Sequence, residues 1–291
     1  MARCLSFVNF KGGVGKTSLA VNIAAYLAQS KGRKTLLVDM DPQSNASQWL
    51  LQFKLWQKLN EKPEHTVYAI FLDKDHNVGQ NLIQAPVKKA DGQIIIGKLD
   101  VLPSCFKLMD LEHEYRERPG VPYYHHFYHH IGIFFPHYEY IIFDCPPNLY
   151  RGSTCAIFAS DEIYVPCNAD RMSYTGFSYL IRKLQQLRSN LNMTVANIGT
   201  RNPAQVRGVI MNDGNPRANY TVIYEEFEIL IARLRQEAPE VLAADFRIIE
   251  PMVRSYEDAR KYAYMEKPVT IKRGPLAEDY REVAEYIDAL D

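Results

Sequence analysis

The chain has 291 residues, enough to bury a sizeable core as one large domain or two small ones. Hydrophobic residues make up 47% and charged residues 23%, a composition that excludes an intrinsically disordered chain. Lysine plus arginine and aspartate plus glutamate both number 34, so the net charge is zero, and any DNA binding would need a local basic patch or one formed by dimerisation.

The cysteines favour a reducing compartment, because there are five and no two form a C-x-x-C pair. The residues after Met1 lead directly into an apolar strand, so we expect neither a signal peptide nor a preceding DNA-binding domain. No run of 18 apolar residues is present, and we therefore expect no membrane span. Together these features predict a cytoplasmic protein.

A glycine-rich segment separates the first predicted strand, Leu5–Phe10, from a predicted helix over Leu19–Ala28. Strand, glycine loop and helix in this order are the context of a phosphate-binding P-loop. Glycines let backbone N–H groups turn inward, and the helix N-terminus adds a positive dipole end. We expect Lys16 to reach the β- and γ-phosphates and Thr17 to bind Mg²⁺; a glycine-rich turn without a ligand is the alternative. The predicted phosphate-binding residues are Gly12, Gly13, Val14, Gly15, Lys16, Thr17 and Ser18.

The loop departs from the usual G-x-x-x-x-G-K-[ST] spacing at its first position, where Phe10 replaces glycine. An additional lysine, Lys11, follows directly. Two cations this close would repel each other unless phosphate lies between them or Lys11 points elsewhere.

The second predicted strand, Lys34–Val38, ends in a polar segment that carries Asp39 and Asp41. Ligands of open parallel sheets lie beyond the carboxyl ends of the strands, so these two acids are well placed for a metal ion or water. The alternative is a polar turn in which Ser44 or Asn45 caps the next helix.

The glycine loop from Lys11 to Ser18, followed by Val-Asp-Met-Asp-Pro-Gln-Ser-Asn-Ala-Ser from Val38, resembles the ParA/Soj group of deviant Walker A ATPases. MinD, the nitrogenase iron protein and the arsenical-pump ATPase belong to the same superfamily, and the Asp-Pro-Gln segment favours ParA over MinD. Strand-like and helical segments alternate along the chain, which predicts an α/β fold with a mostly parallel sheet. The resemblance implies helices on both faces of that sheet and one P-loop NTPase domain over 1–291, with an irregular segment at about 60–98.

The part of the chain before the third motif is less regular. Gln48–Leu59 is expected to form one helix whose two tryptophans belong to the core. Ile94–Ile96 and Leu99–Leu102 are expected to pair as a hairpin around Gly97-Lys98. Histidines at i, i+4 within Tyr123–His130 could hold a metal on one helix face, although a solvated or interface face is the alternative.

The apolar strand Tyr140–Asp144 ends in an acid and is followed by Cys-Pro-Pro, which resembles a Walker B strand and the ParA switch II segment. Its Asp144 would hold Mg²⁺, through water in this family. Further along, Asn212 ends the predicted strand Val206–Asn212, where the resemblance implies a contact with adenine; a simple Asn-Asp-Gly turn is the alternative. Pro251 would pack near the adenine by the same resemblance.

The resemblance also implies a role for each charged residue of the site. Lys16 and the loop backbone would hold the phosphates, and Asp41 would orient or activate the attacking water. Thr17 would bind Mg²⁺ directly, with Asp39 and Asp144 in its outer shell. Lys11 resembles the signature lysine that reaches the ATP of a partner subunit in a homodimer formed only with ATP.

ParA relatives bind DNA nonspecifically as ATP dimers, through salt-dependent contacts of basic side chains with phosphates. The stretch 247–273 is locally more basic than acidic, although an ordinary solvated face is the alternative for each of its residues. The predicted DNA-binding residues are Arg254, Arg260, Lys261, Lys267, Lys272 and Arg273.

The predicted function is an ATP-driven partition or positioning ATPase that is nucleoid-associated and is released from DNA when a ParB-like centromere-binding or adaptor protein stimulates hydrolysis. The alternatives are a positioner of a protein cargo, a MinD-like membrane-cycling regulator and a metal-cluster ATPase. The acidic last helix, Leu276–Leu290, lacks the basic face of a membrane-surface helix, so we expect no membrane partner. The cysteine pair of a metal-cluster ATPase is also missing.

Overall fold

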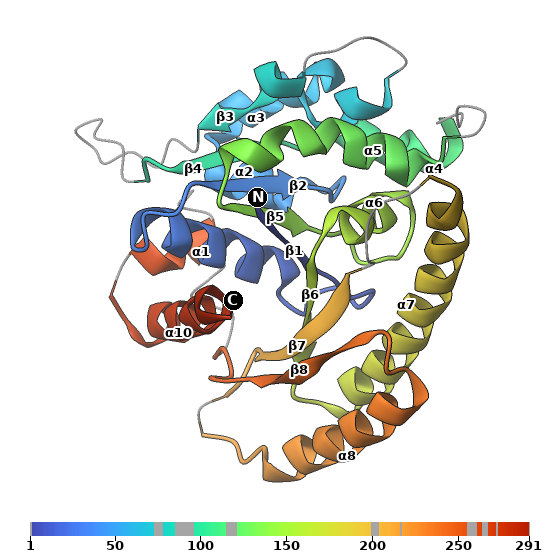
Figure 1. Cartoon of the computed structure of the whole chain (residues 1–291). Coiled ribbons are helices and arrows are strands. Elements are labelled where there is room, and N and C mark those ends of the chain that lie inside the picture. Colours follow the sequence, from blue (N-terminus) through green and yellow to red (C-terminus); the bar gives the residue numbers. More distant parts are fainter. Residues whose placement is uncertain are drawn as a thin grey trace.

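One twisted eight-stranded sheet runs through the computed structural model, in the order β3-β4-β2-β5-β1-β6-β7-β8 (Figure 1). The structure describes residues 2–72, 78–84, 96–114, 121–198, 204–215, 217–254, 261–263, 267–271 and 273–290, with the backbone alone at 84, at 114 and over 191–198. The strands are β1 (Arg3–Phe7), β2 (Thr35–Asp39), β3 (Ile83–Gln84), β4 (Leu99–Leu102), β5 (Tyr140–Asp144), β6 (Glu162–Asn168), β7 (Gln205–Asn212) and β8 (Leu242–Ile249).

All neighbouring strands from β4 to β8 in this order pair in parallel, and the short edge strand β3 is antiparallel to β4. Strands β2 and β5 are buried along their whole length, as their uninterrupted apolar runs require in a sheet covered on both faces. The predicted α/β fold with a mostly parallel sheet is therefore confirmed.

Helices cover both faces of the sheet. They are α1 (Lys16–Gln29), α2 (Asn45–Leu50), α3 (Phe53–Asn60), α4 (Leu111–Glu114), α5 (Tyr123–Ile131), α6 (Arg151–Ala159), α7 (Arg171–Ile198), α8 (Thr221–Glu237) and α10 (Pro275–Ala289). Short 3-10 turns lie at η1 (Pro63–His65), η2 (Val67–Phe71), η3 (Val78–Asn81), η4 (Phe106–Asp110), η5 (Gly132–His137) and η6 (Val269–Ile271). None of the helices among these described residues is both long enough and apolar enough to cross a membrane.

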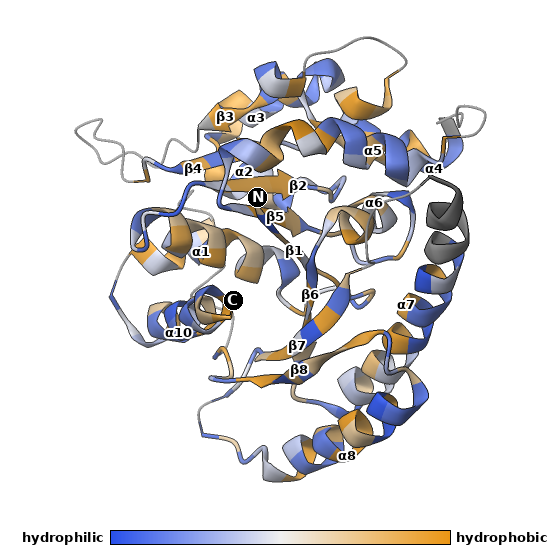
Figure 2. Cartoon of the chain, viewed as in Figure 1, coloured by the Kyte–Doolittle hydropathy of each residue, from blue (hydrophilic) through white to orange (hydrophobic). Residues whose placement is uncertain are grey.

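Two hydrophobic cores result, one on each face of the sheet, because alternate strand residues point to opposite sides. Leu37 and Ile142 pack with α1, α2 and α10, whereas Leu36 and Ile141 pack with α5 to α8. Figure 2 shows the corresponding pattern, with apolar strands and helices that are apolar on one side.

The expectation of a single helix over Gln48–Leu59 is wrong, because the helix breaks between α2 and α3. Leu51 has extended backbone (φ −101°, ψ 152°), and this break allows the consecutive Leu50 and Leu51 both to be buried. It also separates the two tryptophans: Trp49 joins the α1–α10 core, and Trp56 contacts Phe106. Both indoles are buried, as predicted.

Of the two strands predicted to form a hairpin, only Leu99–Leu102 is observed, as β4. Ile94 and Ile95 lie outside the described residues, and the antiparallel partner of β4 is Ile83–Gln84 instead. The sequence offered little signal for this two-residue strand, since so short a segment has no alternation of apolar and polar residues to read.

Candidate nucleotide-binding site

The glycine loop connects β1 to α1 and is held in a conformation that only glycine adopts easily. Gly13 and Gly15 have positive φ angles of 77° and 89°. A β-carbon on Gly15 would lie 1.7 Å from Nδ2 of Asn212, so another chain segment approaches the loop closely at this point. That same amide donates a hydrogen bond to the carbonyl oxygen of Val14 at 2.9 Å.

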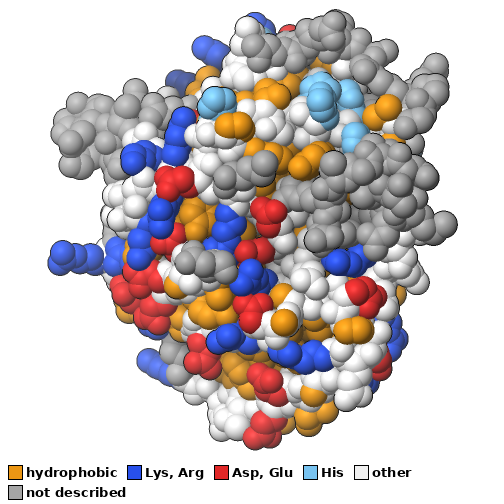
Figure 3. All heavy atoms as spheres, in the orientation of Figure 1, with side chains coloured by type: hydrophobic (Ala, Val, Ile, Leu, Met, Phe, Trp, Pro, Cys, Tyr) orange, Lys and Arg blue, Asp and Glu red, His pale blue; other side chains and the backbone are white. Residues whose placement is uncertain are grey.

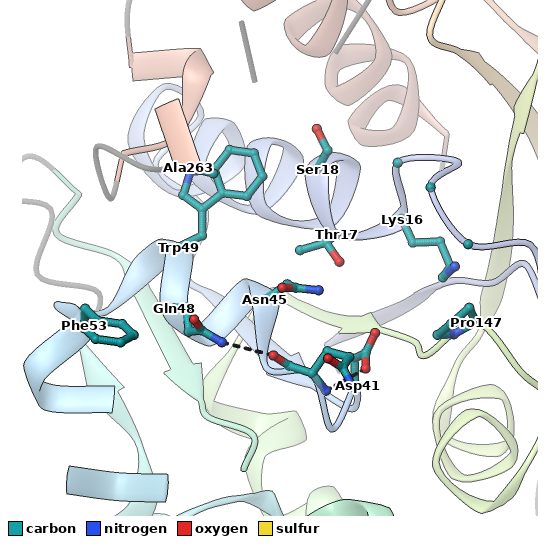
Figure 4. A pocket seen from close by; sticks show the side chains of 14 residues that line it. Lys16, Thr17, Ser18, Asp41, Asn45, Gln48, Trp49, Phe53, Pro147 and Ala263 are labelled. Carbon is teal, nitrogen blue, oxygen red and sulfur yellow. Dashed lines mark hydrogen bonds between the residues drawn. The ribbon is translucent and has the colours of Figure 1, made fainter. Parts of the chain in front are cut away.

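A pocket of about 900 Å³ opens beside this loop (Figure 4). Its wall combines the loop and the start of α1 with the segment after β2, helix α2 and the start of α3. The lining residues are Gly12, Gly13, Gly15, Lys16, Thr17, Ser18, Asp41, Gln43, Asn45, Gln48, Trp49, Phe53, Pro147 and Ala263. Of the residues predicted for the site, Lys11, Val14, Asp39, Asp144, Asn212 and Pro251 do not line it.

The parallel sheet brings the three predicted acids together. Asp39 and Asp144 are register partners at the carboxyl ends of β2 and β5, and both are fully buried. Asp41 follows two residues later and is 6% exposed. Strand β5 lies between β1 and β2, so the carboxyl ends of β2 and β5 bring all three acids to the side of the sheet where the glycine loop follows β1.

Asp39 organises the segment after β2. Its Oδ2 accepts hydrogen bonds from the backbone N–H and the hydroxyl of Ser47, at 2.8 and 2.6 Å, and its Oδ1 accepts one from the N–H of Asp41 at 3.1 Å. Burial raises the pKa of Asp39 to about 7, and the hydrogen bonds from Ser47 act in the opposite direction. The sequence did not identify Ser47, although it stands within the predicted motif.

Asp144 lacks such partners. Both of its carboxylate oxygens are buried and have no hydrogen-bond partner in the described part of the chain. Burial raises its pKa, as do the nearby Asp39 and Asp41, while the Thr17 hydroxyl and Lys16 lower it. A buried carboxylate without a partner is costly unless a cation compensates it.

The donor set fits Mg²⁺ bound together with a phosphate. Mg²⁺ is held by hard oxygen ligands, usually one or two protein groups with phosphate and water. The hydroxyl of Thr17 and the unpartnered carboxylate of Asp144 are such groups. A site made of protein ligands alone would need more donors, and no group of three or more His, Cys, Asp or Glu side chains in the described ranges could hold a metal ion.

Lys16 is the cation of the pocket. It is 6% exposed, and its Nζ donates a hydrogen bond to the carbonyl oxygen of Lys11 at 3.1 Å. Burial lowers its pKa, while Asp144 and Asp41 act in the opposite direction. The Lys16 ammonium therefore lies against the loop backbone and close to the carboxylates of Asp41 and Asp144.

Lys11 points away from the pocket. Its Nζ forms an ion pair with Asp170 at 3.1 Å and a hydrogen bond to the Ser173 hydroxyl at 3.3 Å. Asp170 directly precedes α7 and also accepts a hydrogen bond from the N–H of Ser173. The ammonium groups of Lys11 and Lys16 therefore have different partners, and Lys11 points elsewhere, as one of the two alternatives from the sequence required. An acid directly before a helix, here α7, was the available signal for Asp170.

Comparison with known proteins decides the family. The AAA_31 model, described as an AAA domain, matches residues 2–197. The chromosome-partitioning ATPase Soj of Treponema pallidum is 33% identical over 199 residues, which are 68% of this chain and 70% of that protein. The chain belongs to the ParA/Soj family. The sporulation initiation inhibitor Soj of Bacillus subtilis is 31% identical over 192 residues, 66% of this chain and 68% of that protein.

Solved structures share the fold of this ParA/Soj member. A cobyrinic acid a,c-diamide synthase from Mycobacterium smegmatis with bound ATP analogue and magnesium superposes with a TM-score of 0.69 at 20% identity, covering 99% of this chain and 94% of that one. A putative plasmid partition protein from Borrelia burgdorferi bound to AMPPNP gives a TM-score of 0.62 at 19% identity, and both chains are fully covered. The predicted P-loop NTPase fold is confirmed.

The two residues that the ParA/Soj resemblance assigns to adenine lie outside the pocket. Asn212 is buried at the end of β7, where its amide supports the glycine loop. Pro251 is half-buried just after β8. Contact of either residue with adenine stays a prediction.

Among the DNA-binding residues expected for a ParA/Soj protein, Arg254 is already engaged. Its guanidinium forms two hydrogen bonds to the buried carboxylate of Asp279, at 2.7 and 2.8 Å. Lys261 and Arg273 are exposed and Lys267 is half-buried, whereas Arg260 and Lys272 lie outside the described residues. On the face shown in Figure 3, basic and acidic side chains are interspersed rather than separated. The DNA-binding assignment therefore stays a prediction.

The histidines of α5 do not form a metal site in the described structure. His126 is buried, and its Nε2 is 2.8 Å from the carbonyl oxygen of Ile70. Nδ1 of His130 is 2.9 Å from the carbonyl oxygen of His126, so both rings already have backbone partners. His129 remains exposed. None of the five cysteines forms a disulfide bond, all are buried, and no cluster site is formed from them in the described chain.

Proposed function

We propose that this protein is a partition or positioning ATPase that binds ATP with Mg²⁺ and hydrolyses it. The observation that carries the proposal is the buried, unpartnered carboxylate of Asp144 beside Thr17 and Lys16 at a P-loop. A glycine-rich turn without a ligand would leave both buried carboxylate oxygens without a hydrogen-bond partner in the described chain. The neighbouring structures with bound nucleotide analogues support the same choice of substrate.

The glycine loop and the charged residues around it have roles in phosphoryl transfer to water. The N–H groups of the loop and the Lys16 ammonium hold the phosphates and stabilise charge on the leaving group. Bound Mg²⁺ supplies further charge stabilisation, with Thr17 and Asp144 as the residues that hold it. Asp41, which lines the pocket, orients the attacking water, and Asp39 fixes the backbone of Asp41.

Lys11 acts in trans, on the nucleotide of a second copy of the chain. In the single chain its ammonium is bound by Asp170 and Ser173, outside its own pocket. A homodimer formed on ATP binding would release this ion pair and place Lys11 at the partner's phosphates. ATP thereby acts as the switch between one copy and two.

The dimer binds DNA nonspecifically and is released when a ParB-like partner stimulates hydrolysis. The names of the Soj relatives, which refer to chromosome partitioning and sporulation, support this part of the proposal. The protein would then act in the cytoplasm, associated with the nucleoid. Plasmid or chromosome is the proposed cargo.

Co-sedimentation tests the cycle directly. The protein is mixed with plasmid DNA or with anionic liposomes, in MgATP or in MgADP. We expect it to sediment with DNA in MgATP alone, and less so as the salt concentration rises. Sedimentation with liposomes but not with DNA would reject the partition function in favour of a membrane-cycling one.

A further inference from the structure

A second groove, of about 810 Å³, lies along α8 and shares no lining residue with the nucleotide pocket. Its other wall is the segment that follows β8, with Glu250 and Met252. The groove has both apolar and acidic side chains: they include Tyr224, Ile229 and Met252, and Glu225, Glu228 and Glu250. Figure 3 shows red and orange side chains close together at the end of the molecule where Figure 1 places α8.

Helix α8 packs on the core by one face only. Phe227, Leu230 and Leu234 are buried on that face. Glu225 and Glu228 are three residues apart and thus neighbours on the outer surface. Ile229 lies beside them and is 70% exposed, although a surface helix normally keeps such side chains on its buried stripe. Together with Tyr224 and Met252 of the same groove it forms an apolar surface, which is the feature that marks a binding site.

The carboxylates of the groove differ from the other acids of α8. Glu226 pairs with Arg171, and Glu237 pairs with Arg182 and Arg233. Glu225, Glu228 and Glu250 have no ion pair with any residue that the structure describes. Glu250 lies close enough to Tyr224 to raise the pKa of its hydroxyl, in addition to the larger effect of burial, so the two walls of the groove face each other.

We propose that this groove binds a basic amphipathic segment of a partner protein, with lysines or arginines on the three glutamates and apolar side chains on Tyr224, Ile229 and Met252. Charge complementarity selects this occupant. Three unpaired carboxylates repel the phosphates of DNA or of a nucleotide. The inference concerns a face outside the nucleotide pocket, so its failure would leave the proposed ATPase function intact.

The test uses the full chain without nucleotide and a fluorescent helix-forming peptide of leucine, lysine and alanine, about 18 residues long. Leucines at i, i+3 and i+4 give it one apolar face with lysines on either side. We expect saturable binding that weakens with salt, and no binding of the peptide in which glutamate replaces lysine. The triple variant Glu225→Gln, Glu228→Gln, Glu250→Gln should bind the lysine peptide about tenfold more weakly, as three exposed charge pairs imply.

A matched control removes the same charge elsewhere: Glu61→Gln, Glu64→Gln and Glu282→Gln lie outside the groove and should leave peptide affinity unchanged. Ile229→Ser should weaken binding without changing charge. MgATP binding by each variant shows that it is folded. Equal affinity of the groove and control triple variants would overturn the proposal. So would self-association of the wild type that the groove variant abolishes, since the occupant would then be a second copy.

Discussion

At the scale of single residues, the site is defined by how its few charges are compensated. Asp39 is satisfied by Ser47, Lys11 by Asp170, and Arg254 by Asp279. Asp144 is not satisfied within the described chain. The three charges with a partner within the chain thus differ from Asp144, whose carboxylate oxygens have none among the described residues.

The substitution Lys16→Ala removes the cation of the pocket. A charge-assisted hydrogen bond to phosphate contributes up to about 3 kcal/mol, so ATP affinity should fall by about 100-fold. Titration with a fluorescent ATP analogue measures it. The exposed Lys58→Ala on α3 is the control and should bind like the wild type. Retained affinity in Lys16→Ala would place the phosphates elsewhere.

The substitution Asp41→Ala removes the group proposed to orient water, while leaving the phosphate contacts. Hydrolysis should fall by about 100-fold or more, as is typical for loss of a general base, and ATP should stay bound. Single-turnover hydrolysis of radiolabelled ATP measures both quantities. Asp110→Ala, which breaks only a surface ion pair with Lys107, should hydrolyse ATP normally. Rapid turnover by Asp41→Ala would remove this residue from the mechanism.

At the scale of elements, the glycine loop is supported from behind by β7. Asn212 donates its amide to the Val14 carbonyl, and Gly15 leaves the space that this amide occupies. The loop conformation is thus set by a residue almost two hundred positions away in the chain.

The substitution Gly15→Ala should therefore destabilise the protein. A left-handed conformation alone costs a residue with a β-carbon about 1–2 kcal/mol, and the clash with Asn212 adds to this. Urea unfolding of the protein without nucleotide measures the loss. Gly12→Ala is the control in the same loop, because nothing lies within 4 Å of its added β-carbon. Equal stability of the two variants would contradict the strained conformation.

The sequence could predict those elements whose signal is local. The glycine loop, the strands β2 and β5 and the acids at their ends follow from apolar runs and glycine spacing, and both strands lie within one residue of their predicted bounds. Strand β1 (Arg3–Phe7) begins and ends earlier than the predicted Leu5–Phe10. The break at Leu51 was not predictable, because it depends on two tryptophans that pack in separate places. The partner of Lys11 depends on tertiary contact, and the groove along α8 depends on how two distant segments meet.

At the scale of the whole molecule, the sheet order brings the nucleotide pocket and α7 to the same edge. Strand β1 lies between β5 and β6, so the loop after β1 is flanked by Asp144 on one side and by the start of α7 on the other. Lys11, in the glycine loop, contacts Asp170 and Ser173 at the start of α7 in the single chain. An ion pair this exposed is weak, so ATP in a second copy can compete for it.

The central claim is that Lys11 completes the site of a second copy. Light scattering of the wild type and of Lys11→Ala, each in MgATP and in MgADP, tests it. We expect the wild-type mass to double in MgATP alone, and Lys11→Ala to stay a single chain in both nucleotides while still binding ATP. A Lys11→Ala protein that doubles its mass in MgATP like the wild type would contradict the claim.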